Sequence, residues 1–120
     1  MFPDDYLTDQ PERVIAAEWI RERILSETRE ELPHATAVVI DRWTEREDGL
    51  IEMEATILVD RESQKRIVIG KEGSLLKRIG SAARRELEGF LGKRVFLKTW
   101  VQVRQDWRND SGTLRRLGLE

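Results

Sequence analysis

The sequence predicts an α+β fold in which one three-stranded sheet carries helices packed on a single face. Two segments, 50–60 and 95–103, alternate between apolar and polar residues, as strands with one buried face do. Two longer segments, 9–32 and 74–91, place apolar residues three or four positions apart, which is the period of an amphipathic helix. Each element thus has one apolar surface, and a two-layer arrangement buries these surfaces together.

The composition fits one soluble domain. A chain of 120 residues can bury a single modest core, so we predict one domain over 1–120, with a lead-in at 1–10 and a tail at 105–120 that could form a short helix. The absence of cysteine excludes disulfides and thiolate metal sites. No apolar run approaches the roughly 18 residues of a membrane span, and the N-terminus lacks an export signal. We therefore expect a cytoplasmic protein.

The first helix is expected to begin at Asp9. Glu12 follows three positions later, with Pro11 in the first turn, which is the pattern of a capping box. The helix should end at Leu32-Pro33, because a residue before proline is disfavoured in the α region. Its buried stripe is expected to consist of Ala17, Ile20, Ile24 and Thr28.

A hairpin should follow this helix. Residues 36–43, TAVVIDRW, are β-branched and apolar, and Asp48-Gly49 supplies the positive φ that a tight turn requires. Trp43 and Trp100 are expected to share the open face of the sheet, where covering apolar surface is favoured over stacking on bases. In the second strand, the residues expected to face the core are Ile51, Met53, Ala55, Ile57 and Val59.

The second long helix should span 74–91 and stop at Gly92, a residue type that favours helix C-termini. Its buried stripe is expected to be Leu76, Ile79, Ala83, Leu87 and Phe90. The last strand should bury one apolar face, which consists of Val95, Leu97, Thr99, Val101 and Val103.

The segment IVIGKEGSLL, at 67–76, carries the motif that bears most on function. A nucleotide-binding P-loop would need glycine where Lys65 stands and Ser or Thr where Glu72 stands, so that interpretation fails. The other interpretation is a G-x-x-G loop before a helix. Its glycines let the backbone approach a sugar-phosphate chain, and the helix start offers amide donors. Such loops clamp about four nucleotides of single-stranded nucleic acid. A plain structural turn is the alternative.

The net charge of −2 hides a strong asymmetry along the chain. Residues 1–59 hold 6 basic against 15 acidic residues, a net of −9, whereas residues 60–108 hold 13 against 6, a net of +7. A basic half of this kind can neutralise phosphates. If the two halves interleave in space, their charges would instead cancel.

The sequence offers poor candidates for catalysis or metal binding. His34 is the only histidine, and no cysteine could join it at a metal site. The carboxylates of Glu52 and Glu54 fall on a polar strand face, where solvated charge is the simpler interpretation. We therefore predict no enzyme activity, no metal and no cofactor.

The chain resembles the C-terminal type II KH domain of the bacterial Era GTPases, over the segments TDQPERVIAAEWIRERIL, LPHATAVVIDRW, ILVDRESQKRIVIGKEGSLLKRIGSAARRELE and LGKRVFLKTWVQV. The run 64–85 is the most specific part. The resemblance implies that 65–69 forms a short helix, which periodicity cannot distinguish from a fourth strand. It also implies binding of single-stranded RNA, namely the 3′ end of the small-subunit rRNA, during maturation of the small ribosomal subunit.

The resemblance also implies which residues bind RNA. The loop at 70–73 would grip the RNA backbone, and the strand at 95–103 would form one side of an apolar groove. The residues implied in this way are Gly70, Lys71, Glu72, Gly73, Ile67, Ile69, Ile79, Phe96 and Lys98. Independently of the resemblance, the basic residues Lys65, Arg66, Lys77 and Arg78 flank the loop in the sequence and are expected to add positive charge for RNA binding.

Era proteins carry a GTPase domain ahead of this region and associate loosely with the inner membrane. The sequence has none of the GTPase motifs, so we expect a truncated or stand-alone fragment that neither binds nor hydrolyses GTP. The implied partners are single-stranded RNA, the small ribosomal subunit and the GTPase domain of a longer protein.

A protein-interaction module is the alternative function. In it, the acidic first half and a tryptophan- and leucine-bearing sheet face would dock a GTPase domain or a ribosomal protein. A basic surface converging on the 70–73 loop favours RNA, whereas scattered charge and an exposed apolar sheet favour a protein partner.

Overall fold

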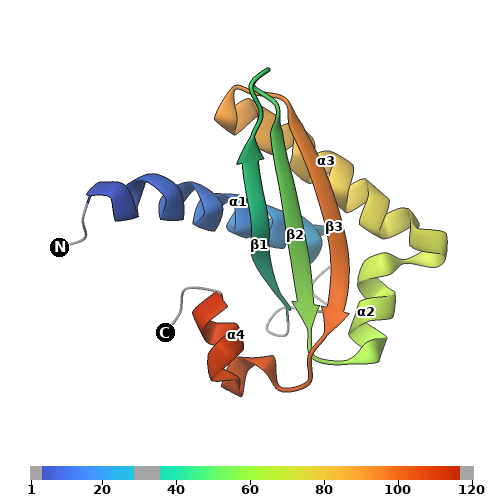
Figure 1. Ribbon diagram of the computed structural model, residues 1–120. Helices are drawn as coiled ribbons and strands as arrows, with labels where there is room; N and C mark the ends of the chain where they lie inside the picture. The colour runs from blue at the N-terminus through green and yellow to red at the C-terminus, as the bar shows by residue number, and fades with distance from the viewer. Residues whose placement is uncertain (1–3, 29–35, 117–120) are drawn as a thin grey trace.

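The computed structural model describes residues 4–28 and 36–116. The protein has one three-stranded sheet, and its two long helices lie behind that sheet in the view of Figure 1. The elements follow in the order α1 (Asp4–Thr28), β1 (Thr36–Glu45), β2 (Ile51–Val59), α2 (Glu62–Ile69), the 3₁₀ turn η1 (Lys71–Gly73), α3 (Ser74–Leu91), β3 (Val95–Val103), the 3₁₀ turn η2 (Trp107–Asn109) and α4 (Ser111–Arg116). The predicted α+β class is confirmed, and α2 is the short helix that the resemblance implied.

β2 is the central strand of the sheet. It pairs antiparallel with β1 through the hairpin and parallel with β3. A parallel pair requires a crossover connection, and α2 and α3 supply it. The 70–73 loop joins these two helices and therefore lies outside the sheet, beyond β3 (Figure 1).

The core lies between the sheet and the layer formed by α1 and α3. The predicted inward face of β2 is confirmed, since its five residues are all at most 3% exposed. On α1, Ala16 occupies the place that we predicted for Ala17, which is only half-buried. The stripe of α3 is confirmed for Ile79, Ala83 and Leu87, which have no exposed surface.

One end of the opposite sheet face is covered by the C-terminal tail. Trp107 of η2 is 6% exposed and packs against Ala37, Val39 and Leu58, whose side chains point away from the helices. The rest of this face is open along β3, where Phe96 and Trp100 are 53% and 43% exposed. The tail thus contributes a small second core that the alternation patterns did not predict.

The two tryptophans that we expected on one face lie on opposite faces. Trp43 pairs in register with Met53 and packs half-buried against the main core, whereas Trp100 pairs with Thr56 on the open face. The cause is a β-bulge between Ile40 and Arg42, which inserts one extra residue and reverses the alternation of β1. Asp41 sits in this bulge, where its carboxylate accepts a hydrogen bond from the Thr56 hydroxyl.

The expected start of the first helix at Asp9 is wrong, because α1 begins at Asp4 and contains Pro11 in its interior. The predicted lead-in at 1–10 is therefore helical from Asp4 onward. The expected stop at Leu32-Pro33 and the position of His34 lie outside the described residues.

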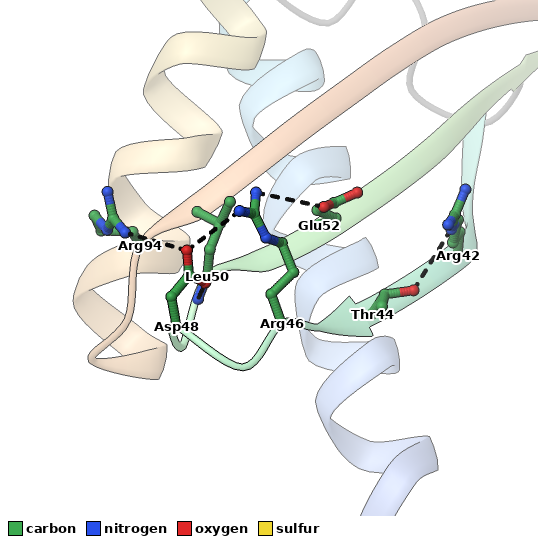
Figure 2. Close-up of polar contacts among 7 residues, drawn as sticks. All are labelled: Arg42, Thr44, Arg46, Asp48, Leu50, Glu52 and Arg94. Atoms are coloured by element: carbon green, nitrogen blue, oxygen red, sulfur yellow. Dashed lines mark hydrogen bonds and ion pairs between the residues drawn. The ribbon is translucent and has the colours of Figure 1, made fainter.

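The predicted turn at Asp48-Gly49 is confirmed, with Gly49 at φ +90°. Figure 2 shows that Asp48 links this turn to the loop before β3. Its carboxylate accepts a hydrogen bond from the Leu50 N–H at 3.1 Å and lies 3.3 Å from Arg46 and 4.0 Å from Arg94. The Leu50 N–H, followed by the two arginines, lowers the pKa of the Asp48 carboxyl below its ordinary value.

Candidate nucleic-acid interface

The 70–73 loop has a backbone that requires glycine at its first position. Gly70 has φ +75° and ψ −176°, a region that residues with a Cβ essentially do not enter. A Cβ on Gly70 would also lie 2.5 Å from the Cβ of Leu75. Glu72 and Gly73 follow with φ +56° and +77°, so the loop contains two successive left-handed residues.

This backbone turns the chain directly into α3. Gly73 is the residue before the helix, and no side chain caps the α3 N-terminus. The first amide groups of a helix have no partners within the helix and carry partial positive charge. Combined with an exposed Lys71, they form a surface on which a phosphate could be held.

A groove of about 350 Å³ begins at this loop and runs between α3 and β3. One of its wall residues is Gly80, at which an added Cβ would meet no atom within 4 Å. The helix backbone is therefore open to the groove at that point. The complete lining consists of Gly73, Leu76, Lys77, Gly80, Ser81 and Arg84 from the loop and α3, and Leu97 and Thr99 from β3.

The basic half of the chain divides into paired and unpaired cations. Arg78 pairs with Glu27 at 2.9 Å, Lys93 with Glu45, and Arg94 with Asp48. These ion pairs with the acidic half cancel part of the positive charge of the basic half. By contrast, a set of cations around the loop forms no ion pair within the part of the chain that the structure describes: Lys65, Arg66, Lys71 and Lys77.

Interleaving of the two halves is thus partial. The acidic half neutralises Arg78, Lys93 and Arg94, while Lys65, Arg66, Lys71 and Lys77 form no ion pair among the described residues. Arg85 and Lys98 also lack an ion pair among the described residues, but neither lines the groove. The structure therefore leaves unpaired cations on the elements on both sides of the loop, α2 and α3, and on Lys71 within it.

Five of the residues expected in the groove do not line it. Ile79 has no exposed surface and belongs to the core. Phe96 and Lys98 sit on the open sheet face, because strand alternation sends the odd-numbered residues Leu97 and Thr99 to the groove. β3 thus lines this groove through the face opposite to the one that was expected. Ile67 and Ile69 are half-buried against the core and do not line the groove.

Most of the residues of α3 that line the groove were not predicted from the sequence. Leu76 was expected in the buried stripe, and Gly80, Ser81 and Arg84 were not singled out. The small pair Gly80-Ser81, one to two turns after the loop and off the buried stripe, is the signal that could have found this surface. Small residues on an exposed helix face leave space for a ligand to approach the backbone.

Other kinds of site find little support in the described residues. They contain no group of three or more acidic or histidine side chains arranged to hold a metal ion. No helix among them is both long and apolar enough to span a lipid bilayer.

Comparison with known proteins gives consistent results. A family model described as "KH domain" matches residues 31–108. The chain is 58% identical over 118 residues to the GTPase Era of Geobacter metallireducens and 52% identical over 119 residues to that of Ruminiclostridium cellulolyticum. These matches include 98% and 99% of this chain but only 40% of each relative. The chain therefore spans about two fifths of the length of these relatives.

Two solved structures of Era superpose on the chain with a TM-score of 0.83 and 43% identity. One is a variant of Aquifex aeolicus Era bound to GDP and aluminium fluoride, and the other is Era in complex with MgGDPNP and nucleotides 1506–1542 of 16S ribosomal RNA. In both cases the match covers 99% of this chain and 40% of the other.

Proposed function

Because this chain belongs to the KH domain family, we propose that it binds single-stranded RNA as a module without catalytic activity of its own. The observation that carries the proposal is the groove that begins at the 70–73 loop, where its lining includes Lys77, a cation without an ion pair among the described residues. The loop backbone and Lys71 would hold the sugar-phosphate chain, and unstacked bases would enter the groove between α3 and β3.

The residues proposed to contact RNA fall into two groups. The backbone group consists of the loop itself, Gly70, Lys71, Glu72 and Gly73, with Lys65, Arg66 and Lys77 as phosphate neutralisers. The base-binding group consists of the groove lining, Leu76, Gly80, Ser81, Arg84, Leu97 and Thr99. Ile67 and Ile69 would support the loop from α2, whereas Arg78 would first have to leave Glu27.

The 3′ end of the small-subunit rRNA is the proposed target, in maturation of the small ribosomal subunit. Support comes from the Era complex with 16S rRNA nucleotides 1506–1542, whose protein is 43% identical to this chain over nearly its whole length. In a longer protein, a GTPase domain would be joined to this domain in the same polypeptide chain. Location in the cytoplasm and a loose association with the inner membrane stay predictions.

A titration of fluorescent 16S rRNA 3′-end oligonucleotide tests this function. Lys71→Asp reverses the charge at the loop, and the affinity should fall at least tenfold while the melting temperature stays unchanged. Lys98→Asp makes the same charge change on the open sheet face and serves as the control. Equal losses for both variants would show that the protein responds to net charge only, and unchanged affinity for Lys71→Asp would remove the loop from the site.

A protein-interaction module is kept as a second candidate because of the exposed aromatic pair on β3. Phe96 and Trp100 lie four residues apart on the open face, at 53% and 43% exposure. Large exposed apolar side chains in one area mark interaction surfaces. The double variant Phe96→Ser, Trp100→Ser should abolish binding to a ribosomal protein or GTPase domain if this candidate holds, without changing RNA affinity.

A further inference from the structure

The groove changes character along its length. Near the 70–73 loop its wall consists of Gly73, Leu76 and Lys77, which offer backbone, apolar surface and one positive charge. Further along, the backbone of Gly80 is bare, and the side chains around it are polar: Ser81, Arg84 and Thr99. Hydrogen-bonding groups around a bare stretch of helix are suited to a flat group whose edge carries polar atoms.

Arg84 is held in place at this polar end by Glu88. Its Nη1 lies 3.1 Å from Oε1 of Glu88, one helical turn further along α3. The other carboxylate oxygen of Glu88 accepts a hydrogen bond from the backbone N–H of Val95 at 2.9 Å. Because Val95 is 4% exposed and is the first residue of β3, the carboxylate is anchored between helix and sheet. Arg84 is thereby tied at one nitrogen while it lines the groove.

A guanidinium has five N–H donors in a planar fork and no acceptor. The Glu88 oxygen engages one nitrogen, so donors on the remaining nitrogens of Arg84 stay available to a ligand. Two such parallel donors require two adjacent acceptors on one edge of the ligand. Among the RNA bases, cytosine presents such a pair at N3 and O2 and guanine at N7 and O6, whereas uracil and adenine alternate donors with acceptors.

We propose that Arg84, positioned by Glu88, makes this groove prefer a base with two adjacent acceptors, so that cytosine or guanine is bound in place of uracil or adenine. This inference rests on the proposed binding of single-stranded RNA. The hydroxyls of Ser81 and Thr99 can each donate or accept, so they add affinity without choosing between these bases. Discrimination between the bases therefore depends on Arg84.

Affinities for two hexanucleotides, all-cytidine and all-uridine, test the inference. The two RNAs have the same charge and ring size and differ at the base edge that Arg84 would contact. The unaltered chain should bind the cytidine RNA about 5- to 100-fold more tightly, which is the discrimination that a bidentate pair provides. Arg84→Lys keeps the charge but loses the fork, so the ratio should fall to within twofold of unity while affinity for the uridine RNA changes little.

Glu88→Gln and Arg85→Lys complete the experiment. Glu88→Gln removes a negative charge beside the groove and frees Arg84, so affinity for the uridine RNA should rise while the cytidine-to-uridine ratio falls. A role of Glu88 in folding alone would move the melting temperature but not the ratio. Arg85→Lys, next to Arg84 but outside the groove lining, should change neither value.

The outcomes separate this inference from the proposed function. If the unaltered chain binds both RNAs equally, or if folded Arg84→Lys keeps the full ratio, the assignment of Arg84 is overturned and RNA binding stands. If neither RNA binds while the chain is folded, the proposed function fails and the inference fails with it.

Discussion

Gly70 and Leu75 approach each other so closely that a Cβ on the glycine would lie 2.5 Å from the Cβ of the leucine. This close approach brings the residue after α2 against the first turn of α3. The first glycine of the G-x-x-G motif is therefore required by the packing of the protein itself, whatever the loop binds.

Gly70→Ala should destabilise the fold. Both the backbone region of Gly70 and the clash with Leu75 oppose a side chain, and strain of this kind costs about 1–3 kcal/mol. Urea denaturation would measure the loss in free energy of unfolding. Gly49→Ala is the matched control, since Gly49 also has positive φ but an added Cβ meets nothing within 4 Å, and its cost should be smaller. Equal costs would mean that the Leu75 contact does not matter.

Substitutions of Gly80 should separate stability from binding. Gly80→Ala replaces glycine inside an α-helix in open space, so it should raise the free energy of unfolding by about 0.5–1 kcal/mol. Gly80→Phe should keep the fold but fill the groove, lowering RNA affinity at least tenfold in a fluorescence titration. Gly89, in the same helix, also has open space around it but does not line the groove. Gly89→Phe should leave the affinity intact, and a loss there would point to a general effect on α3.

Salt should weaken RNA binding, and the steepness of this effect should depend on how many cations near the loop contact phosphates. For single strands the slope of log affinity against log salt concentration is roughly −0.7 per neutralised phosphate. If Lys65, Arg66, Lys71 and Lys77 each contact one phosphate, the slope should be about −3, and Lys71→Ala should make it shallower by about 0.7. Arg78→Ala should change it less, because that side chain is paired with Glu27. An identical change for both variants would contradict the division into paired and unpaired cations.

Asp48 should make stability depend on pH in the acidic range. Its pKa is lowered in the folded protein, chiefly by the Leu50 N–H. The folded state thus binds the proton more weakly than the unfolded state, and the resulting stabilisation is present above the unfolded pKa and is lost as pH falls through the folded value.

Asp48→Asn keeps an acceptor for the Leu50 N–H but removes the charge that Arg46 and Arg94 contact. The difference in free energy of unfolding between the unaltered chain and this variant should shrink when the pH is lowered from 6 to 3. A difference that stays constant over this range would show that the Asp48 charge is not coupled to folding.

Much of the fold could be predicted because it depends on local pattern. The alternation of β2 was correct, and so were Ile79, Ala83 and Leu87 in the stripe of α3, since burial follows side-chain polarity at a fixed period. The two ends of that stripe were wrong, because Leu76 lines the groove and Phe90 is 43% exposed. The failure at Trp43 has an equally local cause, namely the bulge at Asp41, which adds one residue and turns every later side chain of β1 to the other face. Nothing in TAVVIDRW marks that insertion, because the bulged residue is held by Thr56 on the neighbouring strand.

The candidate site was predicted less completely than the fold. The loop and its flanking cations were found because glycine and charge are properties of single residues. The groove is formed by α3 and β3 together. Their relative position depends on how the connection between the parallel strands β2 and β3 packs against the sheet. Leu97 and Thr99 therefore replaced Phe96 and Lys98 as its β3 wall, and Arg84 gained its role from the anchored carboxylate of Glu88.

By itself, the sequence determined that there are two long helices and three strands, where the chain reverses at glycine, and how unevenly charge is distributed along the chain. Each of these follows from the polarity and steric limits of residues close together in the chain. Only the tertiary structure decided which basic side chains remain unpaired, which face of β3 lines the groove, and which arginine is held beside it. Those outcomes depend on contacts such as Arg78 with Glu27 and Glu88 with Val95. Such pairs exist only once distant or differently oriented segments have packed against one another, so no local pattern encodes them.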